Sequence, residues 1–308
     1  MAPAFRPKTP FAPVRRHLAP LPAALPTETL GTWQVGRQLH EGPLARVLEA
    51  RPSSSLEDGG WDYVVKRLHD HWQEEPRAVE MLTREAVVGS QVRNCHLVTV
   101  LDAQLSVAPY YVVLPRLAGR PLSELIAAEG RIELPIALWI ARQTATALAA
   151  LHQAGWLHGD VKPQNIIVGP EGHATLIDLG FARRVGEYGS AADRWVAGTW
   201  NYIAPEAISS TGGCDPRSDL YSLGATLYEM LAGRPPFTGK TLADLAAAHR
   251  QSTPRPLDDV APELPLSAVE LVHELLAKQP LRRPSDAREV VRRLVALEIA
   301  TLHDQVVA

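Results

Sequence analysis

The sequence contains little cysteine, no strong excess of either charge and no long uninterrupted apolar run. Cys95 and Cys214 are too few for a disulfide framework and belong to no Cys-x-x-Cys or Cys/His cluster, so we interpret both as ordinary thiols and expect a cytoplasmic setting. A formal net charge of −3 argues against a dedicated nucleic-acid-binding protein, because such domains are typically basic. Apolar patches such as Ala145–Leu151 fall short of the roughly 20 residues of a membrane helix, so we expect no membrane segment.

The distribution of residue types along the chain predicts one domain behind a leader. Proline recurs without a regular period through residues 1–30, which is typical of a disordered, Pro-rich segment. Short β-type runs dominate from there to about Leu114, and helical patterns dominate after Gly119. The sequence therefore predicts an α+β fold with two lobes across 31–303, a β-rich N-lobe of about 31–117 and a helical C-lobe of about 118–303.

Individual elements follow from periodicity and from the placement of proline and glycine. The expected strands are Trp33–Leu39, Ala45–Ala50, Tyr63–Leu68, Leu97–Leu105 and Tyr110–Leu114. The expected helices are Pro76–Val92, a long one from Pro135 that ends near Gly155, and those at 218–231, 241–250, 267–278 and 286–303. Ile166–Val168 and Ala174–Ile177 predict a hairpin.

The segment His-Gly-Asp-Val-Lys-Pro-Gln-Asn at 158–165 carries the residue types that phosphoryl transfer needs. An Asp can accept the proton of an acceptor hydroxyl, and here Asp160 is followed by Lys162 and Asn165. Asn165 and Asp178 supply hard oxygen ligands suited to magnesium. Because the predicted hairpin returns the chain, we expect Asp178 to lie in the same cleft as Asp160.

Two features of the N-lobe match this chemistry, the Lys66–Glu85 pair and Gly42. Lys66 lies in an apolar strand pattern, and Glu85 follows 19 residues later on the Pro76–Val92 helix, where it can pair with the lysine. A predicted hairpin turn carries Gly42, which allows backbone amides to approach phosphates. His40 and Ala45 stand at the other two positions of a three-glycine pattern.

Together these motifs resemble the eukaryotic-type (Hanks-type) protein kinase family, Ser/Thr class. The resemblance is to a bacterial member of that family. The resemblance extends from about Trp33 to Leu297. It includes Ala204-Pro205-Glu206, which closes the activation segment of the family, and Ser218-Asp219-Leu220-Tyr221-Ser222-Leu223-Gly224, which begins its central helix. It also includes Arg283-Pro284, whose Arg pairs with Glu206 in the family pattern.

The resemblance implies a role for each matching residue. Asp160 would be the catalytic base and Lys162 would touch the transferring phosphate, while Asp219 would brace the catalytic loop. Lys66, held by Glu85, would contact the phosphates of ATP. The remaining nucleotide contacts would come from Gly42, Val47, Leu114, Leu117, Asn165 and Asp178, with Pro115–Leu117 as the hinge. Asn165 and Asp178 would bind Mg2+, or Mn2+ in its place. The implied reaction transfers the ATP γ-phosphate to a Ser or Thr hydroxyl of a protein, the kinase itself included.

Two alternatives stay open at this point. Small-molecule kinases of the aminoglycoside type share His-Gly-Asp, but they commonly have His where Lys162 stands and lack Ala204-Pro205-Glu206, so protein substrates are favoured. A pseudokinase or regulatory ATP-binding module would keep the fold without transferring phosphate. Gly159 stands where many kinases have an Arg that binds an activation-loop phosphate, so we predict activity that does not depend on such a phosphate. Gly89, one turn after Glu85, predicts a packing gap behind the helix.

Overall fold

The computed structural model describes residues 28–55, 60–187, 200–208 and 215–307. The segment 1–27, most of the predicted leader, lies outside the described residues. Glu28–Leu30, which we assigned to the leader, instead form strand β1, paired antiparallel with β2 (Trp33–Glu41). The boundary at residue 30 was therefore wrong by three residues. The strand begins earlier because Leu30 is buried: it is 5% exposed and packs in a small apolar cluster with Val35.

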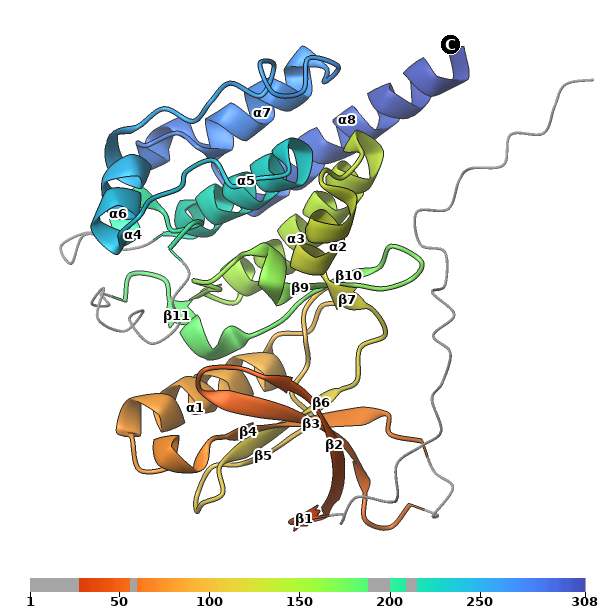
Figure 1. Cartoon of the computed structure of the whole chain (residues 1–308), viewed down its shortest axis with the longest axis vertical. Coiled ribbons are helices and arrows are strands. Elements are labelled where there is room, and N and C mark those ends of the chain that lie inside the picture. The colour runs from red at the N-terminus through yellow and green to blue at the C-terminus, as the bar shows by residue number, and fades with distance from the viewer. Residues whose placement is uncertain (1–27, 56–59, 188–199, 209–214, 308) are drawn as a thin grey trace, which may run out of the picture.

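The N-lobe is one antiparallel six-stranded sheet with a helix against it (Figure 1). Besides β1 and β2, its strands are β3 (Ala45–Pro52), β4 (Tyr63–Leu68), β5 (Asp102–Gln104) and β6 (Tyr111–Pro115), in the order β1-β2-β3-β4-β6-β5. A short 3-10 helix, η1 (Asp70–Trp72), leads from β4 to α1 (Pro76–Gln91). The predicted α+β fold with two lobes is confirmed.

The strand predicted over Leu97–Leu105 is confirmed only at Asp102–Gln104. Leu101 still bonds to Val113 of β6, but Val98 and Val100 donate to elements outside the N-lobe sheet. The Val98 N–H donates to the Leu176 carbonyl at 2.9 Å, and the Val100 N–H donates to the Gly89 carbonyl at 3.0 Å. This segment thus ties α1 to the C-lobe.

The same segment fills the space beside Gly89, where the sequence predicted a packing gap. A Cβ at Gly89 would lie 2.6 Å from Cγ2 of Val100, so the side chain of Val100 already occupies that space. Val88 beside it is fully buried. The prediction of a gap was wrong, because glycine here permits a close approach of the chain to α1 and leaves no hole.

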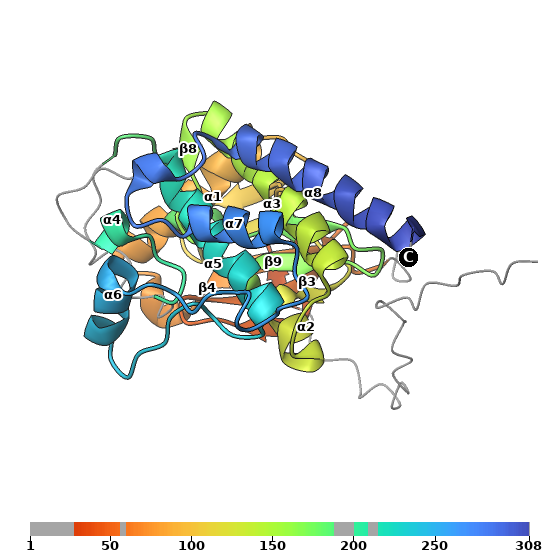
Figure 2. The same cartoon turned by 90° about the horizontal axis from the view of Figure 1, so that it is seen from above.

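The C-lobe is mainly helical (Figure 2). Its helices are α2 (Leu122–Glu129), α3 (Leu134–Gln153), α4 (Pro205–Ile208), α5 (Pro216–Ala232), α6 (Leu242–Gln251), α7 (Leu266–Leu275) and α8 (Ala287–Val307). All of the predicted helices are present, whereas α2 and the four-residue α4 were not predicted. Helix α3 packs against α5 and α8, and α5 packs against α7.

Short strands and 3-10 turns shape the region between the lobes. One small sheet joins β7 (Arg120–Pro121), β9 (Ile166–Val168) and β10 (Ala174–Leu176), and a second pairs β8 (Trp156–Leu157) with β11 (Arg183–Arg184). The 3-10 turns η2 (Pro163–Asn165) and η3 (Leu179–Phe181) flank the β9–β10 hairpin. This hairpin confirms the predicted one and places Asn165 and Asp178 at its two ends.

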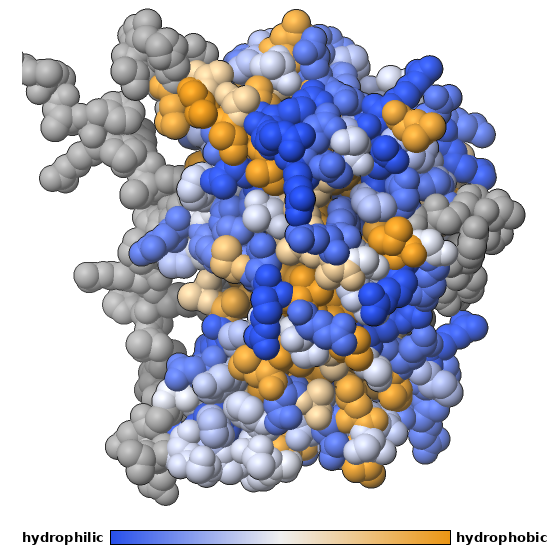
Figure 3. Space-filling view, turned by 180° about the vertical axis from the view of Figure 1, so that it is seen from behind, coloured by the Kyte–Doolittle hydropathy of each residue, from blue (hydrophilic) through white to orange (hydrophobic). Residues whose placement is uncertain are grey.

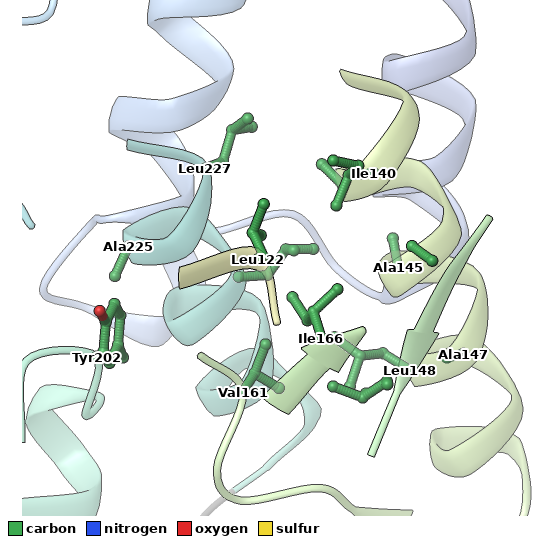
Figure 4. Close-up of a cluster of buried hydrophobic side chains, with 14 of the residues drawn as sticks. Leu122, Ile140, Ala145, Ala147, Leu148, Val161, Ile166, Tyr202, Ala225 and Leu227 are labelled. Carbon is green, nitrogen blue, oxygen red and sulfur yellow. The ribbon is translucent and has the colours of Figure 1, made fainter. Parts of the chain in front are cut away.

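The apolar core of the C-lobe fixes the chain beside Asp160. In Figure 4, Val161 and Ile166 lie in one cluster with Leu148 of α3 and Leu122 of α2. All four side chains are at most 1% exposed. Because Val161 and Ile166 directly follow Asp160 and Asn165 in the sequence, their burial holds both polar residues at the edge of the core.

Among the described residues, one helix, α3, is long and apolar enough to span a membrane by length and composition alone. We did not expect such a segment from the sequence. The helix supplies ten buried residues to the C-lobe core, and helices in protein cores pass the same test.

The face opposite to that of Figure 1 carries apolar residues in separate patches among polar ones (Figure 3). Helix α8 exposes Val295, Ile299 and Leu302, which share one side of the helix by their spacing. The other side of α8 buries Val290 and Leu294.

Candidate active site

Lys66 is bonded to two carboxylates, one from each lobe. Its Nζ lies 2.7 Å from Oε2 of Glu85 on α1 and 2.8 Å from Oδ1 of Asp178, which follows β10. The Glu85 side chain is 2% exposed, whereas that of Asp178 is 33% exposed. The structure therefore brings the predicted Lys66–Glu85 pair together and adds Asp178 to it.

Lys66 favours the charged form of both carboxyls, whereas Glu85 and Asp178 repel each other. Burial alone lowers the pKa of Lys66, but Asp178 and Glu85 outweigh it, so the net direction is upward. Burial raises the pKa of Asp178, but Lys66 outweighs burial and lowers that pKa to about 2. Burial raises the pKa of Glu85, and Lys66 opposes that rise. Lys66 and Asp178 are consequently both charged at neutral pH.

Asp160 has two partners from its own loop. Nζ of Lys162 lies 2.7 Å from Oδ2 of Asp160, and Nδ2 of Asn165 donates to that same oxygen at 2.8 Å and to the Asp160 carbonyl at 2.9 Å. Burial raises the pKa of the Asp160 carboxyl, and Lys162 works against that rise. A carboxylate whose pKa is raised and which lies beside a cleft is suited to accept a proton.

Asp219 supports the loop that carries Asp160. Its carboxylate, 2% exposed, accepts the backbone N–H groups of His158 and Gly159 at 2.8 and 2.9 Å and lies 2.9 Å from Nε2 of His152. Burial raises its pKa, but the hydrogen bonds from His152 and from the Gly159 backbone help to outweigh burial and lower it. The predicted brace is present. Sequence reasoning missed His152, because a lone His in the last turn of a helix has many ordinary explanations.

Two residues of the site, Asp178 and Gly159, have a positive φ angle. Asp178 has φ 67° and ψ 80°, the left-handed region that non-glycine residues rarely adopt. Such strain is concentrated at functional sites. Gly159 has φ 78°, and a Cβ there would lie 2.6 Å from the Phe181 carbonyl oxygen. The backbone itself therefore favours glycine at the position before Asp160.

The predicted nucleotide-contacting residues lie on the elements around this site. Gly42 is in the β2–β3 turn, and Val47 on β3 pairs with Lys66 across the β3–β4 ladder. Leu114 is 8% exposed on β6, and Leu117 is half-buried in the segment that leads to the C-lobe. The sheet register places the side chains of Val47, Lys66 and Leu114 on one face of the sheet. The contacts of all these residues with a nucleotide remain a prediction.

The oxygen donors fit a magnesium ion that also binds phosphate. Asp178 offers a carboxylate, and Asn165 retains its amide oxygen because Nδ2 is the atom that bonds to Asp160. Within the described ranges, no three His, Cys, Asp or Glu side chains form a complete metal site. Magnesium is commonly held by one or two protein ligands together with substrate phosphates, which is the arrangement that these residues allow.

The region after the activation segment is fixed by a buried ion pair. Nη1 and Nη2 of Arg283 lie 2.6 and 2.8 Å from the two carboxylate oxygens of Glu206, and the hydroxyl of Ser218 donates to Glu206 at 2.8 Å. The Arg283 side chain is 0% exposed. Nearby, the hydroxyl of Tyr202 donates to Glu229 on α5 at 2.5 Å, a pair that sequence reasoning did not identify.

The two-lobed fold, the lysine held between Glu85 and Asp178, and the braced Asp160 loop together are the arrangement of a protein kinase domain. Comparison with known families agrees: the protein kinase domain family matches residues 33–295. The chain belongs to this family, and membership implies binding of ATP and use of Mg2+.

The relatives are bacterial Ser/Thr protein kinases. PknA of Mycobacterium tuberculosis is 32% identical over 258 residues, which are 82% of this chain and 58% of PknA. Drp72 of Corynebacterium efficiens is 30% identical over 247 residues, 77% of this chain and 46% of drp72. The chain thus spans about half the length of these relatives.

Proposed function

We propose that this chain is an active Ser/Thr protein kinase, which transfers the γ-phosphate of ATP to a hydroxyl of a protein substrate. The main support is Lys66, whose ammonium is bonded to Glu85 and Asp178 at once. Those contacts connect β4, α1 and the segment after β10, so the groups that would meet the phosphates are already assembled. Positioning and charge neutralisation supply most of the rate in this reaction class.

Asp160 is the proposed catalytic base. With its pKa raised by burial, it accepts the proton of the Ser or Thr hydroxyl as that oxygen attacks phosphorus. Lys162, bonded to Asp160 at 2.7 Å, is the cation available to the transferring phosphoryl group. Asn165 fixes the rotation of the Asp160 carboxylate by donating to Oδ2.

Lys66, Asn165 and Asp178 are the proposed phosphate and metal groups. Lys66 orients the α- and β-phosphates of ATP, and Asp178 with Asn165 would hold Mg2+. When bound, that ion neutralises phosphate charge and orients the γ-phosphate. Mn2+, with the same preference for oxygen ligands, is a permitted replacement.

The hinge leaves one backbone donor for the adenine ring. Pro115 has no N–H, and the Arg116 N–H already donates to the Asp62 carbonyl at 2.8 Å. The Leu117 N–H, by contrast, has no acceptor within the part of the chain that the structure describes. We therefore assign the adenine bond to Leu117 and the apolar wall of the pocket to Val47 and Leu114.

The test is transfer of labelled γ-phosphate from Mg-ATP to a generic basic protein. The parent chain is compared with Asp160→Asn, and with Asp258→Asn, a change of the same kind at an exposed residue. The proposal expects label on Ser or Thr with the parent and Asp258→Asn only, and unchanged ATP binding by Asp160→Asn. Label on the kinase itself in the same assay reports autophosphorylation.

Two results would replace the proposal. Intact ATP binding without transfer to any acceptor would identify a pseudokinase or regulatory ATP-binding module. Transfer to small hydroxyl or amine compounds, but not to proteins, would identify a small-molecule kinase of the aminoglycoside type.

We also propose a cytoplasmic location. The support is the need for ATP together with the free, exposed thiol of Cys95, which suits a reducing compartment. Cell fractionation tests it, and recovery of the chain outside the cytoplasmic fraction would contradict it.

A further inference from the structure

The turn between β2 and β3 is tied to η1 by three hydrogen bonds. Nε2 of His69 lies 2.8 Å from the Gly42 carbonyl oxygen, and Nε1 of Trp72 donates to the Pro43 carbonyl at 2.9 Å. The backbone N–H of His69 donates to the Leu44 carbonyl at 3.0 Å. All three residues of the turn therefore have their carbonyl oxygens bound. Because each acceptor is a carbonyl, the His69 Nε2 must carry the hydrogen.

The segment that holds the turn is itself anchored to the sheet. The side chain of Gln73 donates to the Leu68 carbonyl at 2.7 Å and accepts the Tyr110 N–H at 2.8 Å. The Leu68 N–H donates to the Tyr110 carbonyl at 3.1 Å. The ring of Trp72 also packs, half-buried, against the main apolar core. The turn is thus bonded to a fixed support.

The support lies between two catalytic groups along the chain. Lys66 on β4 comes three residues before His69, and the α1 helix that carries Glu85 begins soon after Trp72. Val47, just beyond the turn on β3, pairs with Lys66. A displacement of the turn would consequently change the geometry around Lys66, where the phosphates of ATP are expected.

The bonds also determine which amides of the turn are free. The Gly42 N–H donates to the Ala45 carbonyl at 2.9 Å, and Pro43 has no N–H. The Leu44 N–H has no acceptor among the described residues. A trans peptide directs its C=O and N–H to opposite sides, so the bond from Trp72 to the Pro43 carbonyl turns the Leu44 N–H away from the indole.

We propose that His69 and Trp72 are positioning residues that hold the β2–β3 turn ready for the nucleotide phosphates. This inference rests on ATP binding by the proposed kinase, but not on phosphate transfer. A turn that is ordered in advance loses less conformational entropy when the nucleotide binds. It also gives a reason why His40 and Ala45 are tolerated at glycine positions, since this turn is fixed by side chains outside it.

Binding measurements separate this role from general stability. Trp72→Phe keeps an aromatic ring but removes the N–H donor, and His69→Ala removes the other side-chain donor. Each variant is expected to weaken Mg-ATP about threefold to tenfold, the range for one lost hydrogen bond. Adenosine, which has no phosphates, should bind as it does to the parent. His69→Gln, whose amide nitrogen reaches close to the position of Nε2, should recover most of the Mg-ATP affinity.

Two matched controls lie in the C-lobe. Trp139→Phe removes an indole donor from the Gly172 carbonyl, and His173→Ala removes a ring nitrogen from the Cys95 carbonyl. Neither should alter the ratio of Mg-ATP to adenosine affinity. Amide hydrogen exchange at Leu44 should be faster in Trp72→Phe and His69→Ala than in the parent and the controls.

Two binding results would overturn the positioning role itself. Unchanged Mg-ATP affinity in both Trp72→Phe and His69→Ala contradicts it, and so does an equal loss for adenosine and Mg-ATP. A parent chain that binds neither ligand would refute the proposed function itself, and the positioning role with it. Tight Mg-ATP binding without transfer would refute only the kinase activity.

Discussion

The guanidinium of Arg84 lies 2.9 Å from the carboxylate of Glu187 and donates to the Ala182 carbonyl at 3.2 Å. Arg84 directly precedes Glu85 on α1, and Glu187 lies nine residues after Asp178. The backbone N–H of Arg184 donates to the same glutamate at 3.0 Å. The side chain of Glu187 thus holds the start of the activation segment against α1. Many kinases order this segment with a phosphate group instead.

Activity should therefore not require phosphorylation of the activation segment. Replacing Ser190 and the other hydroxyl residues of that segment, Thr199 excepted, with Ala should leave the rate of transfer nearly unchanged. Ser190 lies outside the described residues, so this prediction rests on Gly159 and on the Arg84–Glu187 pair. Initial rates of dephosphorylated parent and variant test it, and a collapse of activity in the variant would refute it.

Glu187→Gln should lower the rate of transfer about twofold to fivefold, because it removes a half-exposed ion pair worth up to about 1 kcal/mol. The matched control is Glu80→Gln. Glu80 also bonds to Arg84, at 2.7 Å, but within α1 and without touching the activation segment. Equal effects of the two substitutions on the rate would show that the contact to Glu187 has no special role.

An arginine restored at Gly159 should not create control by phosphorylation. The φ of 78° and the 2.6 Å approach to the Phe181 carbonyl oppose any side chain there, so Gly159→Arg should destabilise the fold by about 1–3 kcal/mol. Gly130→Ala is the control, with φ 75° and no atom within 4 Å of the added Cβ. Urea unfolding compares them, and a Gly159→Arg variant as stable as Gly130→Ala would contradict the steric argument.

The proposed chemistry could be inferred from the sequence because phosphoryl transfer demands particular side chains in a fixed order. Lys66, Asp160 and Asp178 fill those positions, and the structure brings each to the same place. The fold was predictable for a related reason, since apolar periodicity and proline placement marked α1 and α3 clearly.

Contacts between distant residues that belong to no motif were not predictable in this way. His152 and Asp219 are 67 residues apart, and Arg84 and Glu187 are 103 apart. Each is a residue type that is common on any helix or loop, and only the folded chain selects its partner. Gly89 shows the same limit, because a gap and a close contact look identical in sequence until Val100 is placed.

Arg283→Ala should be strongly destabilising, by about 3–5 kcal/mol, because it removes the cation that balances the largely buried carboxylate of Glu206. Arg293→Ala is the control, since its pair with Glu274 is 34% and 36% exposed and is worth about 0–1 kcal/mol. Urea unfolding at neutral pH measures both, and similar losses would contradict the prediction.

The same pair gives stability a pH dependence of known sign. Burial raises the pKa of Glu206, but Arg283 outweighs burial and lowers it below the ordinary 4.5. The stabilisation is therefore complete above about pH 4.5 and is lost as the pH falls through the lowered pKa. The Arg283→Ala variant should lack this component of acid sensitivity.

The pH dependence of transfer should reveal Asp160. Its carboxyl must be ionised to accept a proton, so kcat/KM should fall as the pH falls through its pKa, which burial raises above the ordinary value of 3.8. Lys162 opposes that rise. Lys162→Met should consequently move the acidic limb of the profile to higher pH, in addition to lowering the maximal rate.

Lys240→Met is the control for this shift, because Lys240 is exposed and lies outside the site. A limb that moves equally in both variants would point to overall charge as its cause. A limb that stays in place in Lys162→Met, while the rate falls, would assign the titration to a group other than Asp160. The position of the limb thus separates the effect of Lys162 on the base from its contact with the phosphoryl group, which alters only the height of the profile.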